Sequence, residues 1–245
     1  MKDREVGLRS HLQELRRRLL ISVLALMVCV GLALAFYKPI LNILIHPIEP
    51  KLAEMGTHLV FVEVTEMFAV VMKTSLIAGL VGASPVLMYE IIMFVTPGLT
   101  TKERRYLFIF LPGALLAFAA GVVFGYFVLV PPALRFLLSF GSEIATPMIR
   151  IGNYVNVVVM LLFWIGISFE TPLVMLLISK IGLVSYRGFA RFRRYWILVA
   201  FLLGAVITPT FDPVNQALVA IPLIVLYEVG ILLARLFGAR KPKAA

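Results

Sequence analysis

The stretch LLISVLALMVCVGLALAF, residues 19–36, contains no charged side chain and lies between Arg18 and Lys38. As an α-helix rising about 1.5 Å per residue it is roughly 27 Å long, close to a bilayer hydrocarbon core of about 30 Å. The whole chain is also apolar, since 61% of its 245 residues are hydrophobic and only 15% are charged. Such a composition is unlike that of a soluble domain, so residues 19–36 are predicted to form a transmembrane helix.

Five further apolar segments of the chain are interpreted in the same way. The six predicted spans are residues 19–36, 67–93, 106–130, 153–179, 195–208 and 214–234. The fifth span is only about 20 Å long as a helix, too short for an average bilayer unless the membrane is thinner there. The sequence thus predicts an all-α polytopic membrane protein, in which residues 1–245 form a single membrane domain.

Two connections between the spans are predicted to lie outside, at residues 37–65 and 131–152. The first contains three prolines and short apolar stretches, so we expect it to pack on the outer face as a cap. The second begins at Pro131-Pro132, where the helix of the third span is expected to end because proline has no backbone N–H.

Basic residues are distributed unevenly among the connections. The two ends of the chain and the loops near Lys102 and Arg187 contain 18 of the 23 Lys and Arg residues, whereas the two outside connections contain four. The positive-inside rule therefore places both termini in the cytoplasm. The net charge of +10 is interpreted as a topology signal, and no nucleic-acid partner is expected.

Residues 1–18 are predicted to be a cytoplasmic amphipathic segment. Ser10 and Gln13 have the spacing of a capping box, and leucines recur at helical spacing after it. We therefore expect a helix that lies along the membrane interface before the chain turns into the first span. Glu14 and Arg18 are four residues apart, which favours an ion pair on the surface of this helix.

Glu170 is the one charged residue of the fourth span and lies about 15 Å from its cytoplasmic end. A carboxylate near the bilayer centre costs about 2.5–3.5 kcal/mol, so it needs a partner, a proton or water. Pro172 cannot donate to the carbonyl of Ser168, and we expect this to open the helix beside Glu170. Two interpretations remain open: a hydrated polar notch, or a protonated side chain bonded to a neighbouring span.

Besides Glu90 near the end of the second span, two other charged residues lie within predicted spans. Glu228 is about 10 Å from the cytoplasmic edge, where it is either an interfacial residue or part of a functional site. Lys73 is about 10 Å from the outer end of the second span, and its long side chain is expected to extend outward to the interface. Neither residue alone predicts an ion path.

Thr100 and Glu103 have the spacing of a capping box at the start of the third span. Glu103 is alternatively an exposed acceptor for a cationic ligand, since a carboxylate binds a guanidinium group through two hydrogen bonds. The chemistry of the residues leaves both interpretations open.

Motifs for catalysis are missing from the sequence. It contains no H-E-x-x-H, no G-x-S-x-G and no glycine-rich phosphate loop. Its single cysteine and three scattered histidines do not suggest a metal site. Neither an enzyme nor a cofactor is expected.

Short motifs are spread in a fixed order over nearly the whole chain. They are His11–Leu19 (HLQELRRRL), Tyr89-Glu90-Ile91 with Phe94, Pro97-Gly98-Leu99, Glu103-Arg104-Arg105, Tyr126–Leu129 with Pro131, Ser168–Pro172 (SFETP), Arg193-Arg194-Tyr195, Thr208-Pro209, Asp212-Pro213, Gln216 and Tyr227-Glu228-x-Gly230. In this order they resemble the TatC family, the multispanning receptor subunit of the twin-arginine protein translocase. Two places depart from the family pattern: Ile92-Met93, where many members have an aromatic residue, and residues 208–213, a turn one residue longer than usual.

This resemblance implies a concave, glove-like bundle of six helices in the cytoplasmic (inner) membrane with both termini in the cytoplasm. It implies a receptor for the twin-arginine signal peptides of folded precursor proteins. It also implies that the receptor recruits single-span TatA/TatB-type subunits into a multimeric complex driven by the proton-motive force.

The resemblance further assigns roles to individual residues. The implied signal-peptide site consists of Glu103, Phe94, Glu14, Leu15 and Arg17. Glu170 is implied to be the polar residue of the concave face. Thr208 and Gln216 are implied contacts of the partner subunits.

An alternative function is a proton-coupled small-solute transporter that uses Glu170, Glu228 and Lys73, since ionisable groups within spans often mark ion paths. An intramembrane hydrolase is a third hypothesis, for which the sequence shows no nucleophile and base. Glu170-dependent solute uptake by the purified chain in liposomes would favour the transporter, whereas inactivity without partner proteins would favour the translocase.

Overall fold

The computed structural model describes residues 8–95, 101–140, 148–208 and 212–238. Side chains are described for the same residues except 8–11, 95 and 101–109. The regular elements of this part of the chain are all helical. They are α1 (Leu8–Ala35), α2 (Tyr37–Ile45), α3 (Glu49–Glu54), α4 (Glu66–Val95), α5 (Thr101–Phe124), the π-helical η2 (Gly125–Leu129), α6 (Val130–Ser139), α7 (Ile151–Ser168), α8 (Thr171–Lys180), α9 (Tyr186–Ile207) and α10 (Pro213–Phe237).

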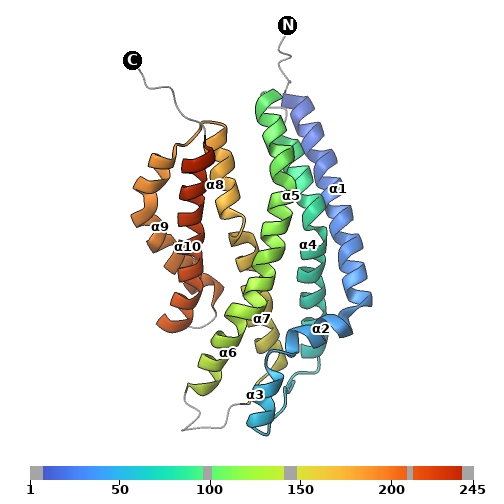
Figure 1. Cartoon of the computed structure of the whole chain (residues 1–245). Helices are drawn as coiled ribbons and strands as arrows, with labels where there is room; N and C mark the ends of the chain where they lie inside the picture. The colour runs from blue at the N-terminus through green and yellow to red at the C-terminus, as the bar shows by residue number, and fades with distance from the viewer. Residues whose placement is uncertain (1–7, 96–100, 141–147, 209–211, 239–245) are drawn as a thin grey trace.

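Within the described ranges, five helical segments are long and apolar enough to cross a membrane. They are Leu12–Ala35, Glu66–Phe94, Phe110–Ser139, Ile151–Lys180 and Pro213–Phe237. The fifth predicted span, residues 195–208, lies mostly in the second half of α9, where an apolar stretch follows four arginines. α9 runs beside α10 (Figure 1). The predicted all-α membrane fold is confirmed, and α9 differs from the other spans in its short apolar stretch.

The two ends of the bundle differ in structure (Figure 1). α1 begins and α10 ends at the same end, which we call the terminal end. α2 and α3 cover the opposite end, the cap end. There the Tyr154 hydroxyl donates to the carbonyl of Leu44 at 2.5 Å, and the Tyr126 hydroxyl donates to that of Ile43 at 2.7 Å. These bonds tie α2 to α7 and η2 at the cap end.

α1 is a single helix from Leu8 to Ala35. The expectation that the chain lies along the interface and then turns into the first span is therefore wrong for residues 8–18. Neither proline nor glycine interrupts residues 8–30, so nothing in the local sequence breaks the helix between the arginines and the apolar run. Ser10 lies inside α1 and does not precede it.

The helix of the third span continues past Pro131-Pro132, contrary to the prediction. α5 is followed by η2 and then by α6, which reaches Ser139. At the end of η2 the backbone N–H of Val130 donates to the carbonyl of Gly125, five residues earlier. This change in hydrogen-bond register places both prolines in the first turn of α6, where a missing N–H has little consequence.

The fourth span is divided at Glu170, as Pro172 predicts. α7 ends at Ser168 and α8 begins at Thr171, with Pro172 in the first turn of α8. The backbone N–H of Glu170 donates to the carbonyl of Ile167 at 3.0 Å, a tighter turn than an α-helix makes. Glu170 therefore lies at the break between two helical segments.

Buried apolar side chains form two clusters. The larger one joins the cap-end helices to α4, η2, α6 and α7 and to parts of α9 and α10. The smaller one, around Met175, Tyr227 and Ile231, joins α8 to α10 with α9 packed beside it. α1 packs chiefly on α4, where Gly79 permits the approach because an added Cβ would lie 2.7 Å from the Cα of Val30.

Candidate functional site

Three charged side chains of α1 and α4 meet at the terminal end. Arg18 donates from Nε to Glu14 Oε1 at 3.1 Å and from Nη1 to Glu90 Oε2 at 3.0 Å. The pairing of Glu14 with Arg18 was predicted from their spacing and is confirmed. Glu90 was not predicted as a member, because it is 72 positions from Arg18 and only the packing of α1 on α4 brings the two together.

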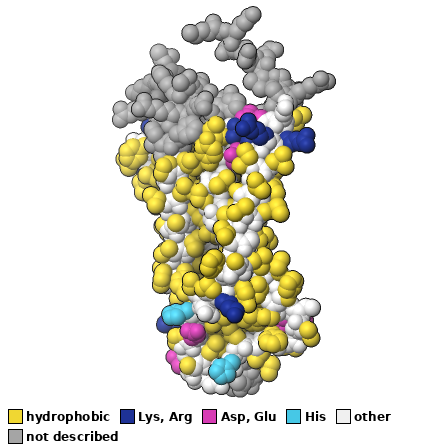
Figure 2. Space-filling model, turned by 90° about the vertical axis from the view of Figure 1, so that its right-hand side faces the viewer, with side chains coloured by type: hydrophobic (Ala, Val, Ile, Leu, Met, Phe, Trp, Pro, Cys, Tyr) yellow, Lys and Arg dark blue, Asp and Glu magenta, His cyan; other side chains and the backbone are white. Residues whose placement is uncertain are grey.

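A groove of about 610 Å³ opens beside these three residues. It is lined by Gln13, Glu14, Arg17, Arg18, Ile21, Tyr89, Glu90 and Met93. Figure 2 shows basic and acidic side chains gathered near the terminal end, with a wide band of hydrophobic side chains between them and the charged groups at the cap end. We call the groove lined by these eight residues the terminal groove.

The carboxylates of the terminal groove are only partly satisfied. The Glu14 side chain is 26% exposed and that of Glu90 is 9% exposed. Among the described residues, Arg18 is the one hydrogen-bond donor that reaches either carboxylate. Because an ionised carboxylate has about four lone-pair sites, both groups retain acceptor capacity for a further donor. The arrangement suits a ligand that carries a guanidinium group.

The other predicted residues of the signal-peptide site are described to different extents. Arg17 lines the terminal groove, and Leu15 is 42% exposed on α1. Phe94 is half-buried in the last turn of α4, one residue beyond Met93 of the groove. The side chain of Glu103 lies outside the described residues; its backbone is in the first turn of α5, which begins directly after Thr100. The predicted capping box lies outside the described residues, because Thr100 and the side chain of Glu103 are not described.

Glu170 borders a separate pocket of about 240 Å³. The other lining residues are apolar and come from α4, α5 and α8: Met88, Ile91, Ile92, Phe110, Ala114, Leu173, Val174 and Leu177. Within the described part of the chain no side chain donates to or accepts from the Glu170 carboxylate. The interpretation in which Glu170 is bonded to a neighbouring span therefore finds no support, and the carboxylate is the polar group of an otherwise apolar notch.

α4 forms the wall between the terminal groove and this notch. Tyr89 and Glu90 line the groove, whereas Met88 and Ile91 line the notch. Ile92, one of the departures from the family pattern, also lines the notch. A residue change on α4 therefore affects one space or the other according to the helix face on which it lies.

Glu228 forms an ion pair at the surface. Its Oε2 accepts from Nη2 of Arg193 on α9 at 2.8 Å. Its Oε1 lies 2.5 Å from Nε of the same arginine. Both side chains are more than a third exposed. Glu228 thus joins α10 to α9 and does not share a pocket with Glu170.

A second charged cluster lies at the cap end, and it was not predicted from the sequence. Glu66 accepts from the backbone N–H of Val62 at 2.9 Å, of Glu63 at 3.4 Å and of Gly152 at 3.1 Å. Arg150 donates to Glu66 at 3.0 Å and to Glu63 at 2.9 Å. These hydrogen bonds raise the pKa of the Arg150 guanidinium above its ordinary value, so it stays charged. We call this the cap latch, because it joins α4 to the start of α7.

Lys73 lies in the same cavity as the cap latch. Its Nζ hydrogen-bonds Asn156 Oδ1 on α7, and both residues line a polar cavity of about 360 Å³ together with Glu66 and Arg150. Lys73 thus lies toward the cap end of α4, and its extension toward the outer interface stays a prediction.

Thr208 and Gln216 both lie near Gly204, where α9 packs on α10. The Thr208 hydroxyl donates to the carbonyl of Gly204 at 2.7 Å, and Thr208 is 8% exposed. A Cβ added to Gly204 would lie 2.8 Å from the carbonyl oxygen of Gln216. Asp212 caps α10 by accepting from the N–H of Asn215 at 2.7 Å. Thr208 therefore faces the packing between the helices, while Gln216 is half-buried.

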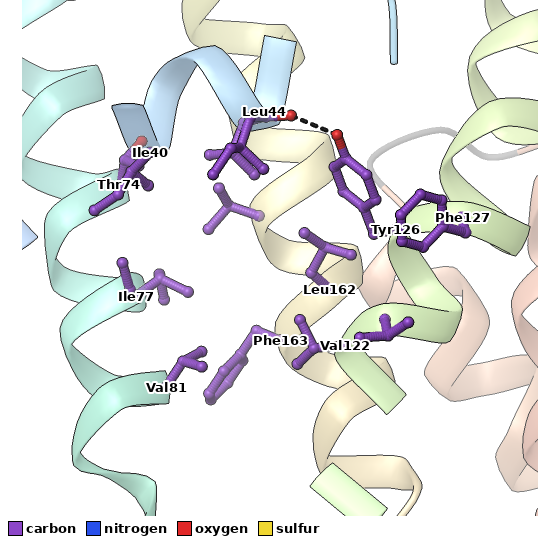
Figure 3. Close-up of a pocket in the computed structure, with 14 residues that line it drawn as sticks. Ile40, Leu44, Thr74, Ile77, Val81, Val122, Tyr126, Phe127, Leu162 and Phe163 are labelled. Carbon is purple, nitrogen blue, oxygen red and sulfur yellow. Dashed lines mark hydrogen bonds between the residues drawn. The ribbon is translucent and has the colours of Figure 1, made fainter. Parts of the chain in front are cut away.

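A third space in the bundle is almost entirely apolar (Figure 3). It has a volume of about 390 Å³ and lies between α2, α4, α7 and the α5–η2 segment. Figure 3 shows Tyr126 at its edge, with the hydroxyl directed to the backbone of α2. The polar atoms of this space are few, so it offers no constellation for acid–base or nucleophilic chemistry.

The fold and these sites define a class: a polytopic helical membrane protein with a charged groove at one end and an apolar notch around an intramembrane carboxylate. The family model of the Sec-independent protein translocase protein (TatC) matches residues 10–222. The chain is 37% identical over 243 residues to the TatC protein of Carboxydothermus hydrogenoformans, covering 99% of this chain and 97% of that protein. It is 39% identical over 236 residues to that of Aquifex aeolicus, covering 96% and 97%.

Solved structures agree with the sequence comparison. A crystal structure described as the twin-arginine translocase receptor TatC superposes with a TM-score of 0.83 at 39% identity, covering 92% of this chain and 98% of that one. The chain belongs to the TatC family of Sec-independent protein translocase components.

Proposed function

We propose that this chain is the receptor subunit of a twin-arginine translocase and that the terminal groove binds the arginines of signal peptides on folded precursor proteins. The observation that carries the proposal is the sharing of Arg18 by Glu14 and Glu90 beside an open groove. The two carboxylates hold the Arg18 guanidinium group and keep further acceptor sites beside the groove, which supports binding of a second guanidinium group there.

The proposed site also includes the residues that the family resemblance assigns to signal-peptide binding. Glu103 is proposed as the principal acidic partner of the signal arginines, and α5 begins two residues before it. Phe94 and Leu15 provide apolar surface, and Arg17 lines the groove. Together with Glu14 these residues form the proposed signal-peptide site.

The apolar notch beside Glu170 is proposed to accept the hydrophobic part of the signal peptide. Eight of its nine lining residues are apolar, so a leucine-rich or alanine-rich segment buries its surface there favourably. The Glu170 carboxylate hydrates the notch locally, since a bare charge in hydrocarbon is unfavourable.

The cap-end half of α9 and α10 is proposed as the contact surface for single-span TatA/TatB-type subunits in a multimeric complex. Val206, Val214 and Ile221 are at least half-exposed there, and a helix that crosses the membrane can pack on them. Gln216 is the polar group at the edge of this surface, with Thr208 beneath it. No cofactor and no nucleic acid takes part in this function.

The terminal end is proposed to face the cytoplasm, with the protein in the cytoplasmic (inner) membrane. The uneven distribution of Lys and Arg supports this orientation. The proton-motive force is the proposed energy source for export.

Charge reversal at Glu103 tests the proposal. Glu103→Lys is expected to abolish photocrosslinking of a twin-arginine signal peptide to the full-length protein in membranes while insertion stays normal. The matched control is Glu54→Lys, which reverses an exposed carboxylate at the cap end that pairs with Lys51 and should leave crosslinking unchanged. Unchanged crosslinking to Glu103→Lys would refute the proposed site.

A proton-coupled small-solute transporter is not favoured by the structure. Glu228 is paired with Arg193 at the surface, and Lys73 lies in the cap-end cavity. Glu170 borders a different pocket. The three groups that such a transporter would use do not line a common path among the described residues.

A further inference from the structure

Three arginines in the first half of α9 lie on one helix face. Arg187, Arg191 and Arg194 are separated by four and three positions, which places them within about 60° around the helix axis. All three are exposed. The fourth arginine, Arg193, points away from this face and pairs with Glu228 of α10.

The three arginines have no carboxylate partner among the residues that the structure describes. Arg187 donates to the hydroxyl of Tyr186 at 3.2 Å. Arg194 donates to the hydroxyl of Tyr195 at 2.9 Å, with its Cζ 4.7 Å from the ring centroid. Arg191 makes no side-chain hydrogen bond or ion pair with the described residues. The three positive charges are therefore left without an opposite charge among the described residues.

The position of these arginines along α9 makes their positive charge less favourable unless an anion binds beside them. They lie in the first half of the helix, whose macrodipole is positive at its start and therefore disfavours cations. The first turn of α9 contains no acidic residue, and Ser185 makes no side-chain capping hydrogen bond. An external anion beside this face would compensate both the side chains and the helix N-terminus.

The same face becomes apolar farther along the helix. Leu198 and Leu202 follow Arg194 by four and eight positions and are 69% and 67% exposed. The distance from Arg194 to Leu202 along the axis is about 12 Å. One continuous face thus offers guanidinium groups near the terminal end and hydrocarbon contact deeper in the membrane.

From this arrangement we propose that the face formed by Arg187, Arg191, Arg194, Leu198 and Leu202 binds an anionic phospholipid. The headgroup phosphate contacts the arginines, and the acyl chains lie along the two leucines. A free phosphate ion would use only the charged half of this face. The proposal is independent of signal-peptide binding, because α9 does not contribute to the terminal groove.

Competitive photocrosslinking tests this proposal on the full-length protein. The protein is placed in phosphatidylcholine nanodiscs that contain a photoreactive phosphatidylglycerol, and the lipid crosslinked to residues 186–207 is quantified. Unlabelled phosphatidylglycerol is expected to compete about tenfold more effectively than phosphatidylcholine, since each arginine near an anionic lipid surface contributes a few-fold preference. Raising the salt concentration to about 0.5 M should reduce this preference by screening.

Two matched triple variants separate a specific face from general charge. Arg187→Gln/Arg191→Gln/Arg194→Gln should reduce the preference to about twofold or less. Arg16→Gln/Lys38→Gln/Arg135→Gln removes the same number of exposed charges elsewhere and should retain it. A triple Arg→Lys variant at the α9 positions keeps the charge, should retain most of the preference, and shows whether the helix tolerates substitution there.

Three results would overturn the proposal. The first is an unchanged lipid preference in the glutamine variant of α9. The second is an equal loss of preference in the control variant, which would indicate net charge alone. The third is displacement of the photoreactive lipid by inorganic phosphate as effectively as by phosphatidylglycerol, which would indicate a site for free anions.

Discussion

At each end of the bundle one arginine is shared by two carboxylates, but the carboxylates are satisfied to different degrees. In the cap latch, Glu66 accepts from Arg150 and from three backbone N–H groups. In the terminal groove, Glu14 and Glu90 accept from Arg18 and from no other described residue. The same ion-pair chemistry therefore fixes the chain where the acceptors are saturated and leaves a ligand site where they are not.

The largest expected effect is the loss of the Glu66 carboxylate. Glu66→Ala leaves three backbone donors without their acceptor at a position that is 8% exposed, and it leaves Arg150 with Glu63 alone. We expect the midpoint of thermal unfolding in detergent to fall by about 5 °C or more.

The matched control for Glu66 is Glu63→Ala, which removes the exposed carboxylate that shares Arg150. This change should lower the unfolding midpoint by less than about 2 °C, because exposed ion pairs contribute little. Equal shifts for the two variants would contradict the distinction between a saturated and an unsaturated carboxylate.

Gly152→Ala disturbs the cap latch without removing a charge. The added Cβ would lie 2.8 Å from Glu66 Oε1, so the carboxylate must move away from the backbone N–H of Gly152. We expect a loss of about 1–3 kcal/mol in the free energy of unfolding, measured by denaturant titration in mixed micelles. Gly31→Ala, where an added Cβ meets nothing within 4 Å, should be neutral or slightly stabilising, and equal destabilisation by both changes would argue against the latch.

Glu90→Gln is expected to separate binding from folding. The amide keeps one acceptor for Arg18, so the unfolding midpoint should change little. The affinity for a twin-arginine signal peptide should fall about tenfold, because hydrogen bonds to a charged acceptor are stronger than those to an amide. A fluorescence titration with labelled peptide measures the affinity, and a parallel unfolding curve measures the stability. A large loss of stability with normal affinity would contradict the account, because it would make Glu90 a structural residue and not a ligand-binding one.

Glu228→Gln is expected to have the smallest effect. The ion pair with Arg193 is solvent-exposed, so its loss should cost less than about 1 kcal/mol of stability. Signal-peptide affinity should stay at the wild-type value, since Glu228 lies outside the terminal groove. A marked loss of affinity in the same titration would show that the groove is not the whole binding site.

Features set by neighbouring residues could be predicted from the sequence. The apolar spans, the Glu14–Arg18 pair and the helix break before Pro172 all depend on spacings of a few residues or on one continuous run. The π-helical turn before Pro131 was missed because a proline pair usually ends a helix, and a shift in hydrogen-bond register avoids this only in a particular packing environment.

Contacts between distant parts of the chain could not be predicted. Glu90 is 72 positions from Arg18, and Glu66 is 84 from Arg150, so neither pair leaves a local pattern. Glu66 directly precedes the predicted second span and Glu90 lies near its end, where carboxylates are common because an apolar run meets water there. Packing of α4 on α1 at one end and on α7 at the other turned these boundary residues into two different sites.

The central claim is that the carboxylates of the terminal groove recognise guanidinium groups, and peptide selectivity tests it most directly. The affinity of the full-length protein in nanodiscs is measured for a twin-arginine signal peptide and for its twin-lysine counterpart. The wild-type protein should prefer arginine by about tenfold, and Glu14→Gln/Glu90→Gln should lose this preference while its unfolding midpoint stays near the wild-type value. An unchanged preference for arginine in the double variant would contradict the claim.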